Sequence, residues 1–165
     1  MLRKMIRLGS VRYGTRIRVS DPCYNMDTWC AGTLDNVLPG EYLCTAEVAY
    51  TGKKNGGCVS ALQVRHADYP EAVPDELVTS FEAGVDSAQL GFFDEKYFAE
   101  NVSRKDWKNW YGEVREATSH MAGTLAGCSC VSVTGYGDGC YPVYIARNSS
   151  GKIIAVKAVF LTTLA

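Results

Sequence analysis

The sequence has no long apolar run and no excess of charge of one sign. Its 165 residues carry 17 Lys and Arg against 18 Asp and Glu, which gives a formal net charge of −1. A membrane-spanning helix needs about 20 consecutive apolar residues, and the charged N-terminal stretch lacks the apolar segment of a signal peptide. A balanced charge provides no overall attraction for nucleic acid. We therefore expect a cytoplasmic protein without a membrane partner, and we do not expect nucleic acid as its partner.

The charges are nevertheless unevenly distributed along the chain. Residues 1–20 contain six basic side chains and no acidic one, whereas residues 71–100 contain eight acidic side chains and Lys96 alone as a base. Charge runs of this kind are typical of solvated faces of one molecule. A basic segment that contacts phosphate or an acidic partner is the alternative.

The chain also lacks the usual signatures of zinc sites and of cysteine nucleophiles. Seven cysteines are an odd number, which favours free thiols in a reducing compartment over a disulfide framework. Cys128 and Cys130 are one residue apart, closer than the spacing of about two to four in structural zinc sites. The two histidines, His66 and His120, stand in no local catalytic motif with a cysteine. We expect neither a metal nor a cofactor, and we assign no catalytic residue.

The chain does contain a series of segments in which apolar and polar residues alternate, as in antiparallel β-strands. A hairpin closes the series, and Pro142 within it favours an edge strand. The predicted strands are Glu41–Tyr50, Cys58–His66, Val85–Phe93, Cys128–Thr134, Tyr141–Ile145 and Ile154–Phe160.

A single amphipathic helix is predicted between the third and fourth of these strands. Ser103 is a suitable N-cap, and Trp107 and Trp110 begin an apolar stripe with helical spacing that continues through Tyr111 and Val114. Because such a stripe is stable only when covered, we expect both tryptophans to be buried. The predicted fold is mainly β: an antiparallel β-sandwich or flattened barrel, with this one helix packed on it. Residues 1–165 are predicted to form one domain, and its oligomeric state stays open.

Four short motifs resemble a family of bacterial and bacteriophage proteins catalogued as domain of unknown function 4241. The most specific is GDGCYPVY, residues 137–144, and the others are SDPCY (20–24), LPGEY (38–42) and GVDSAQLGFFD (84–94). The resemblance implies a shared β-rich fold and implies no activity.

Four aspartates lie at strand ends or turns, where carboxylates from distant parts of the chain can meet. They are Asp21, Asp86, Asp94 and Asp138. Hard cations such as Mg²⁺ prefer oxygen ligands, so a metal-dependent hydrolase that uses Asp21, Asp86 and Asp138 is an alternative function. Aspartates at such places also serve as turn residues that bind nearby backbone N–H groups. For Asp138, between two glycines, we expect hydrogen bonds within its own turn.

Aromatic residues beside turns point to recognition. Tyrosine and tryptophan provide large contact areas at low entropic cost and are enriched in binding surfaces. Those beside turn signals are Tyr24, Trp29, Tyr69, Tyr136 and Tyr141. We predict a ligand-binding set of Asp138, Tyr136, Tyr141, Asp21, Tyr24 and Trp29. The predicted function is a non-enzymatic intracellular binding protein of bacterial or phage origin, which engages a host protein or sequesters a small-molecule ligand.

Overall fold

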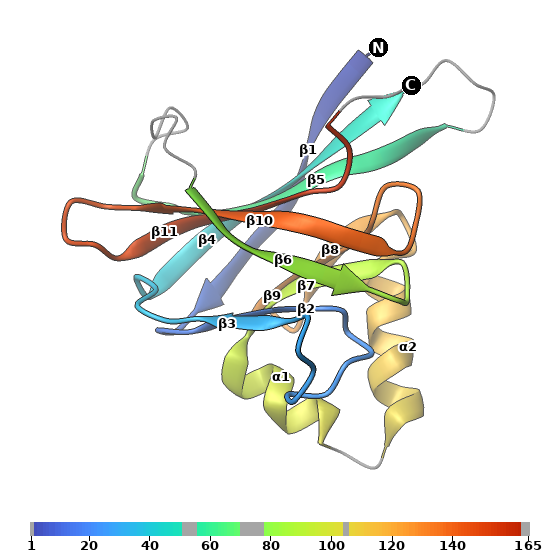
Figure 1. Ribbon diagram of the computed structural model, residues 1–165, viewed down its shortest axis with the longest axis horizontal. Coiled ribbons are helices and arrows are strands. Elements are labelled where there is room, and N and C mark those ends of the chain that lie inside the picture. The colour runs from blue at the N-terminus through green and yellow to red at the C-terminus, as the bar shows by residue number, and fades with distance from the viewer. Residues whose placement is uncertain (1, 51–55, 70–77, 104–105, 163–165) are drawn as a thin grey trace.

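The computed structural model describes residues 2–50, 56–69, 78–103 and 106–162. These residues form two antiparallel β-sheets and two short helices (Figure 1). The elements are β1 (Leu2–Tyr13), β2 (Ile17–Ser20), β3 (Gly32–Leu34), β4 (Gly40–Tyr50), β5 (Gly57–His66), β6 (Val78–Val85), β7 (Gln89–Asp94), α1 (Glu95–Val102), α2 (Trp107–Ala117), β8 (Ala122–Leu125), β9 (Ser129–Val133), β10 (Gly139–Arg147) and β11 (Ile153–Val159).

The larger sheet has the strand order β1-β4-β5-β11-β10-β6, and the smaller sheet has the order β3-β2-β7-β9-β8. The two sheets do not close into a barrel, so the prediction of a mainly β, sandwich-like fold is confirmed in its sandwich form. Neither helix among the described residues is long and apolar enough to cross a membrane.

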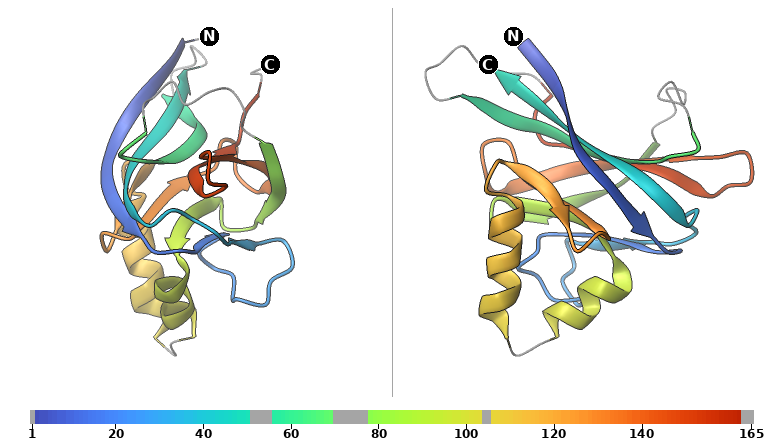
Figure 2. Two further views of the ribbon diagram at one scale, coloured as in Figure 1. Left: turned by 90° about the vertical axis from the view of Figure 1, so that its left-hand side faces the viewer. Right: turned by 180° about the vertical axis from the view of Figure 1, so that it is seen from behind.

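The molecule has three layers: the larger sheet, the smaller sheet, and the helices on the far side of the smaller sheet (Figures 1 and 2). Strand β7 shows how alternation builds them. Phe92 belongs to the core between the two sheets, whereas Phe93 packs with Phe98 and Trp110 under the helices. Both phenylalanines are fully buried, because β7 has packed neighbours on both faces.

The predicted amphipathic helix forms as α2, but the prediction of only one helix is wrong, because α1 precedes it. The Asp94 carboxylate accepts a hydrogen bond from the Tyr97 N–H and caps α1, and Ser103 is the C-cap of α1 instead of the predicted N-cap. Asp106 precedes α2. Helix α1 was missed because its sequence, EKYFAENV, shows too few apolar residues to form a stripe.

The two tryptophans of α2 have different environments. Trp110 is 2% exposed and its indole N–H donates to the carbonyl oxygen of Pro22 at 2.8 Å. Trp107 is 44% exposed and stacks on Tyr111. The prediction that both are buried is wrong for Trp107, which lies in the first turn of α2, beyond the packed part of the helix.

The strand predicted over Val85–Phe93 is also interrupted. β6 ends at Val85, a turn follows at residues 86–88, and β7 begins at Gln89. The residues that face the intersheet core are odd-numbered in β6 (Ala83, Val85) and even-numbered in β7 (Leu90, Phe92). A continuous strand would keep either odd-numbered or even-numbered residues on one face, so this change shows that the turn separates two strands.

Pro142 does not lie in an edge strand, since β10 has β6 on one side and β11 on the other. The pairing of β10 with β11 begins at Val143, however, so at Pro142 itself β10 pairs only with β6. The missing N–H of proline is tolerated there because the ladder to β11 has not begun. The edges of the larger sheet are β1 and β6.

Candidate functional site

Three chain segments that are distant in sequence meet at one end of the sandwich. They are the loop after β2 with Asp21 and Tyr24, the β6–β7 turn at residues 86–88, and the β9–β10 turn with Asp138. Hydrogen bonds join the first and third of these segments to the β6–β7 turn. We call these three segments the rim.

The Asp21 carboxylate is the buried centre of the rim. Its Oδ1 accepts from the Cys23 N–H and the Ser87 hydroxyl, each at 2.7 Å, and its Oδ2 accepts from the N–H groups of Asp86 and Ser87, each at 2.8 Å. A carboxylate has about four acceptor positions, and all are in use here. Asp21 therefore fastens the loop after β2 to the β6–β7 turn, and the same bonds leave it no acceptor position for a ligand.

Asp138 makes a second such link. Its Oδ1 accepts from the Ala88 N–H at 2.9 Å, so the hydrogen bond that we expected within its own turn instead reaches the β6–β7 turn. Ala88 has a φ of +57°, an unusual value for a residue with a side chain. The Thr134 N–H donates to its carbonyl oxygen at 3.1 Å. Hydrogen bonds at both polar groups of Ala88 offset the cost of this backbone conformation.

Three successive N–H groups, at Asp86, Ser87 and Ala88, thus donate to two carboxylates of the same protein. Consecutive N–H groups in a turn form a concavity that binds anions. In this protein the concavity holds Asp21 and Asp138, so it is filled from within. The arrangement fixes the positions of all three rim segments.

Asp86 and Tyr24 form an outer pair on the rim. The Tyr24 hydroxyl donates to Asp86 Oδ2 at 2.6 Å. Burial raises the pKa of the Tyr24 hydroxyl, and the hydrogen bond to Asp86 raises it further. Tyr24 therefore keeps its proton and acts as a donor, while the Asp86 side chain is exposed.

The tyrosines of the β9–β10 segment differ in exposure. Tyr141 packs edge-on against Phe160 and donates to the carbonyl oxygen of Gly137. Burial raises the pKa of the Tyr141 hydroxyl, and the nearby Asp138 charge adds to this. Tyr136 is 69% exposed. Tyr141 thus stabilises the turn, whereas Tyr136 presents an open ring.

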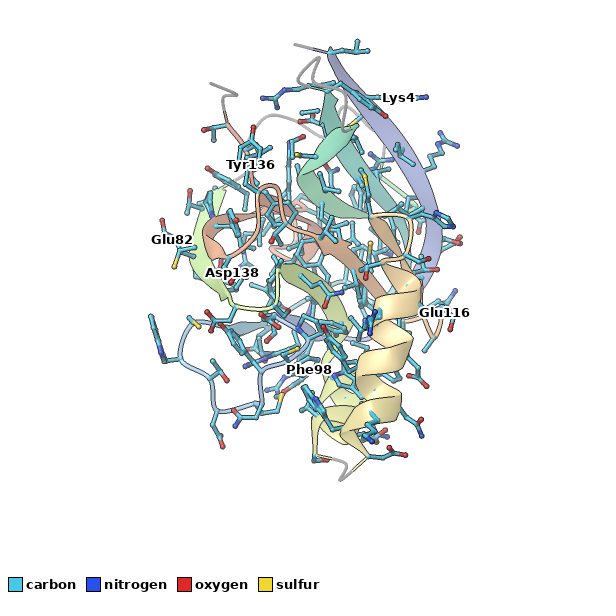
Figure 3. The ribbon with its side chains drawn as sticks, turned by 90° about the vertical axis from the view of Figure 1, so that its right-hand side faces the viewer. Lys4, Glu82, Phe98, Glu116, Tyr136 and Asp138 are labelled. Carbon is cyan, nitrogen blue, oxygen red and sulfur yellow. The ribbon has the colours of Figure 1, made fainter. Side chains whose placement is uncertain are left out.

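Trp29, in the loop after β2, is 89% exposed, the most open of the large apolar side chains among the described residues. Its neighbour Cys30 is bonded to β6, because the Cys30 carbonyl oxygen accepts from the Gly84 N–H at 2.8 Å. Figure 3 shows Tyr136, Asp138 and Glu82 on one side of the molecule, with Glu116 of α2 on another. The predicted aromatic and acidic residues thus include an exposed set at this end of the sandwich.

Asp94 is not part of the rim. It lies at the other end of β7, where its Oδ1 caps α1 and its Oδ2 accepts from the Gly14 N–H at 3.3 Å. Three of the four predicted aspartates therefore come together and the fourth does not. Within the described parts of the chain, no group of three or more His, Cys, Asp or Glu side chains could hold a metal ion. The geometry gives no support to the metal-dependent hydrolase.

His66 and Cys130 are buried, whereas His120 is exposed. His66 Nδ1 accepts from the Asp68 N–H at 3.2 Å, which places the ring proton on Nε2, 3.1 Å from the carbonyl oxygen of Pro39. Burial raises the pKa of the core thiol of Cys130, and the neighbouring Cys44 thiol raises it further. Cys128 is half-buried.

Two rim features were missed in the sequence. Ser87 donates twice to Asp21, and the loop residue Cys30 lies alongside β6. The Asp86-Ser87 sequence is typical of a turn, so the turn could have been predicted, but the sequence does not indicate that Ser87 binds Asp21. Cys30 carries no local signal, because its contacts arise from pairing across the fold.

Two hollows in the part of the surface that the structure describes lie away from the rim. One of about 470 Å³ is lined mainly by α2 residues, including Asn109, Trp110 and Glu113. Another, of about 220 Å³, lies at the irregularity of β1 beside Gly9 and is lined by residues of β1, β4 and β5. The rim presents exposed side chains instead.

The chain belongs to the family described as "Protein of unknown function (DUF4241)", whose model matches residues 13–158. The match spans all of the rim. No curated protein and no solved structure matches the chain.

Proposed function

We propose that this member of the DUF4241 family is a non-enzymatic binding protein that holds a partner protein at the rim. The observation that carries the proposal is the exposure of Trp29 and Tyr136, at 89% and 69%, beside segments that are tightly fixed by internal hydrogen bonds. Large aromatic side chains in water cost free energy in isolation and contribute strongly when a partner covers them.

The charge around these rings defines the chemistry of the partner. Glu82, Asp86 and Asp138 have exposed side chains, and no ion pair joins them to any residue that the structure describes. A complementary surface therefore carries Lys or Arg around an apolar centre. Arginine suits both parts, because its guanidinium stacks on aromatic rings and binds carboxylates.

The internal bonds of the rim favour binding. Asp86 accepts from Tyr24 and Asp138 accepts from Ala88, so both carboxylates are held before a partner arrives. Side chains that are already ordered lose little conformational entropy on association. The exposed aromatic rings then provide contact area on a scaffold that does not need to rearrange.

We place this activity inside a bacterial cell, in a protein of bacterial or phage origin, with a host protein as the partner. Sequestration of a small ligand is the other form of the same function. The protein partner is favoured because the predicted side chains stand out from the surface, whereas a small ligand usually needs a concave site.

A capture experiment tests the proposal. The tagged protein is incubated with bacterial lysate, and captured proteins are quantified for the wild type, for the double variant Trp29→Ala/Tyr136→Ala, and for Trp107→Ala. The last is a matched control, because it removes an exposed aromatic ring that belongs to α2 and not to the three rim segments. We expect one or a few proteins to be captured by the wild type and the control and to be lost with the double variant.

Equal capture by all three proteins overturns the assignment of the rim. Mass spectrometry of small molecules released on denaturation tests whether the protein instead sequesters a small ligand. A compound that the wild type retains and the double variant loses would replace the protein partner with a small ligand.

A further inference from the structure

Cys140 and Cys30 lie on either side of one glycine of β6. Gly84 is directly opposite Cys140 in the antiparallel pairing of β6 with β10. The Gly84 N–H donates to the Cys30 carbonyl oxygen and so points away from β10. Gly84 and Cys140 therefore form a non-hydrogen-bonded pair, in which side-chain positions share a face and lie about 4.5–5.5 Å apart.

Cys30 occupies the space that a side chain on Gly84 would fill. A Cβ atom added to Gly84 would lie 2.7 Å from Cys30 Sγ and 2.8 Å from Cys30 Cβ. Because this direction is the face shared with Cys140, the Cys30 thiol lies over Gly84 on the side of β6 where the Cys140 side chain stands. Glycine is required at position 84 for this approach, since any larger residue would displace Cys30.

We propose that Cys30 and Cys140 are an oxidisable pair that forms a disulfide bond across Gly84. A disulfide requires Cβ atoms about 3.5–4.5 Å apart. Because β6 lies between the two cysteines, the bond forms only when the loop after β2 moves toward β10, after which rotation about the two Cα–Cβ bonds aligns the sulfurs. Cys140 is exposed and Cys30 is half-buried, so both are reachable from solvent, in contrast to the buried Cys44 and Cys130.

The oxidant in this proposal is a peroxide. The Cys140 thiolate attacks one peroxide oxygen, the O–O bond breaks, and the released hydroxide takes up a proton to become water. The Cys30 thiolate then attacks the sulfur of the resulting sulfenic acid, forms the S–S bond and displaces a second hydroxide, which is protonated to water. Two thiols lose two electrons and two protons, and one peroxide becomes two waters.

The bond would act on the rim. Cys30 follows Trp29 in the chain, and its thiol lies close enough to the Tyr24 hydroxyl to contribute to the raised pKa of that hydroxyl. Closing the disulfide draws Cys30 toward β10, breaks this contact and ties the Trp29 loop to the sheet. This consequence for partner binding rests on the proposed function, whereas the disulfide itself does not.

The test is mass spectrometry of the full-length protein after reduction and then after treatment with hydrogen peroxide. Thiols are alkylated under denaturing, non-reducing conditions, and cross-linked peptides are mapped. We expect all seven cysteines to be alkylated before oxidation and two fewer afterwards, with a peptide that joins Cys30 to Cys140. Cys140→Ser should lose this peptide, and Cys58→Ser, at a half-buried position elsewhere, should keep it.

Gly84→Ala separates geometry from chemistry, because both thiols remain while the new Cβ displaces Cys30. We expect the yield of the cross-link to fall at least about tenfold in this variant, since thiol pairing depends steeply on placement. The proposal is overturned if oxidation joins Cys44 to Cys130, joins two molecules, or stops at sulfinic acid on Cys140 without a cross-link. The capture experiment tests only the proposed function, so its failure would leave the disulfide proposal to be decided by the cross-linked peptide.

Discussion

The rim and the helix-covered face of the smaller sheet both concentrate aromatic residues, yet they use them in opposite ways. Under the helices, Phe93, Phe98 and Trp110 form one buried cluster with ring centroids 4.8–6.1 Å apart. At the rim, polar bonds to carboxylates hold the chain together, and Trp29 stays 89% exposed. An aromatic residue thus stabilises the fold in one region, and in the other it is available to a partner.

The largest effect that would test this comparison is expected at Trp110. Trp110→Ala should lower the free energy of unfolding by about 3–5 kcal/mol, because a large buried side chain is lost and the Pro22 carbonyl loses its donor. Trp107→Ala should lower the free energy of unfolding by only about 0.5 kcal/mol, because the Trp107 side chain is 44% exposed. Urea unfolding followed by far-UV circular dichroism measures both. Similar losses for the two variants would show that the helix packs differently.

The next effect concerns the buried carboxylate of the rim. Asp21→Asn should cost about 2–3 kcal/mol, because an amide NH₂ replaces an oxygen that now accepts two hydrogen bonds, and buried donors lose their acceptor. Asp86→Asn is the matched control, because the Asp86 carboxylate is exposed and accepts a hydrogen bond from the Tyr24 hydroxyl; this variant should cost under about 1 kcal/mol. If Asp21→Asn is as mild as the control, the polar centre of the rim contributes little to stability.

A smaller effect is expected at Asp138. Asp138→Asn keeps one oxygen for the Ala88 N–H, so stability should fall by only about 0.5–1.5 kcal/mol. Calorimetric titration of Mg²⁺, Mn²⁺ and Ca²⁺ into the wild type and this variant provides the second measurement. We expect no saturable binding to either protein. Saturable binding to the wild type that disappears in the variant would return the metal-dependent hydrolase to consideration.

The smallest change in stability is expected for the exposed rings. Trp29→Ala and Tyr136→Ala should each alter the free energy of unfolding by no more than about 0.5 kcal/mol, since neither ring is packed. Thermal unfolding of both variants beside Trp110→Ala gives the contrast directly. A loss above about 2 kcal/mol at either ring would show that it supports the fold and is not held ready for a partner.

Strands with clear alternation could be predicted well, and segments decided by capping could not. β4 and β5 fall within one residue of the predicted ranges, because one face of each meets a core and the other does not. α1 escaped prediction, since Asp94 at its N-cap and Phe98 beneath it stabilise a helix whose own sequence shows no stripe. The turn after Val85 was missed because apolar and polar residues alternate on both sides of it, as they would in one continuous strand.

The candidate site was predicted as a set of residue types but not as an arrangement. Asp21, Asp86 and Asp138 were chosen because they stand at turns, and they do meet. Their roles differ because burial differs: Asp21 is enclosed with four donors, whereas Asp86 and Asp138 remain exposed. Sequence position alone does not report which carboxylate the fold encloses.

The sequence by itself determined the mainly β class, the closing hairpin and the family, because side-chain alternation and short motifs are local properties of the chain. Only the tertiary structure decided that Asp138 binds the backbone at Ala88, that Trp110 is buried while Trp29 is open, and that Cys30 lies over Gly84 beside Cys140. Each of these facts depends on contacts between residues at least 50 positions apart in the chain, or on burial by such residues. Contacts of that range form only when the sheets pack, so no window along the sequence contains them.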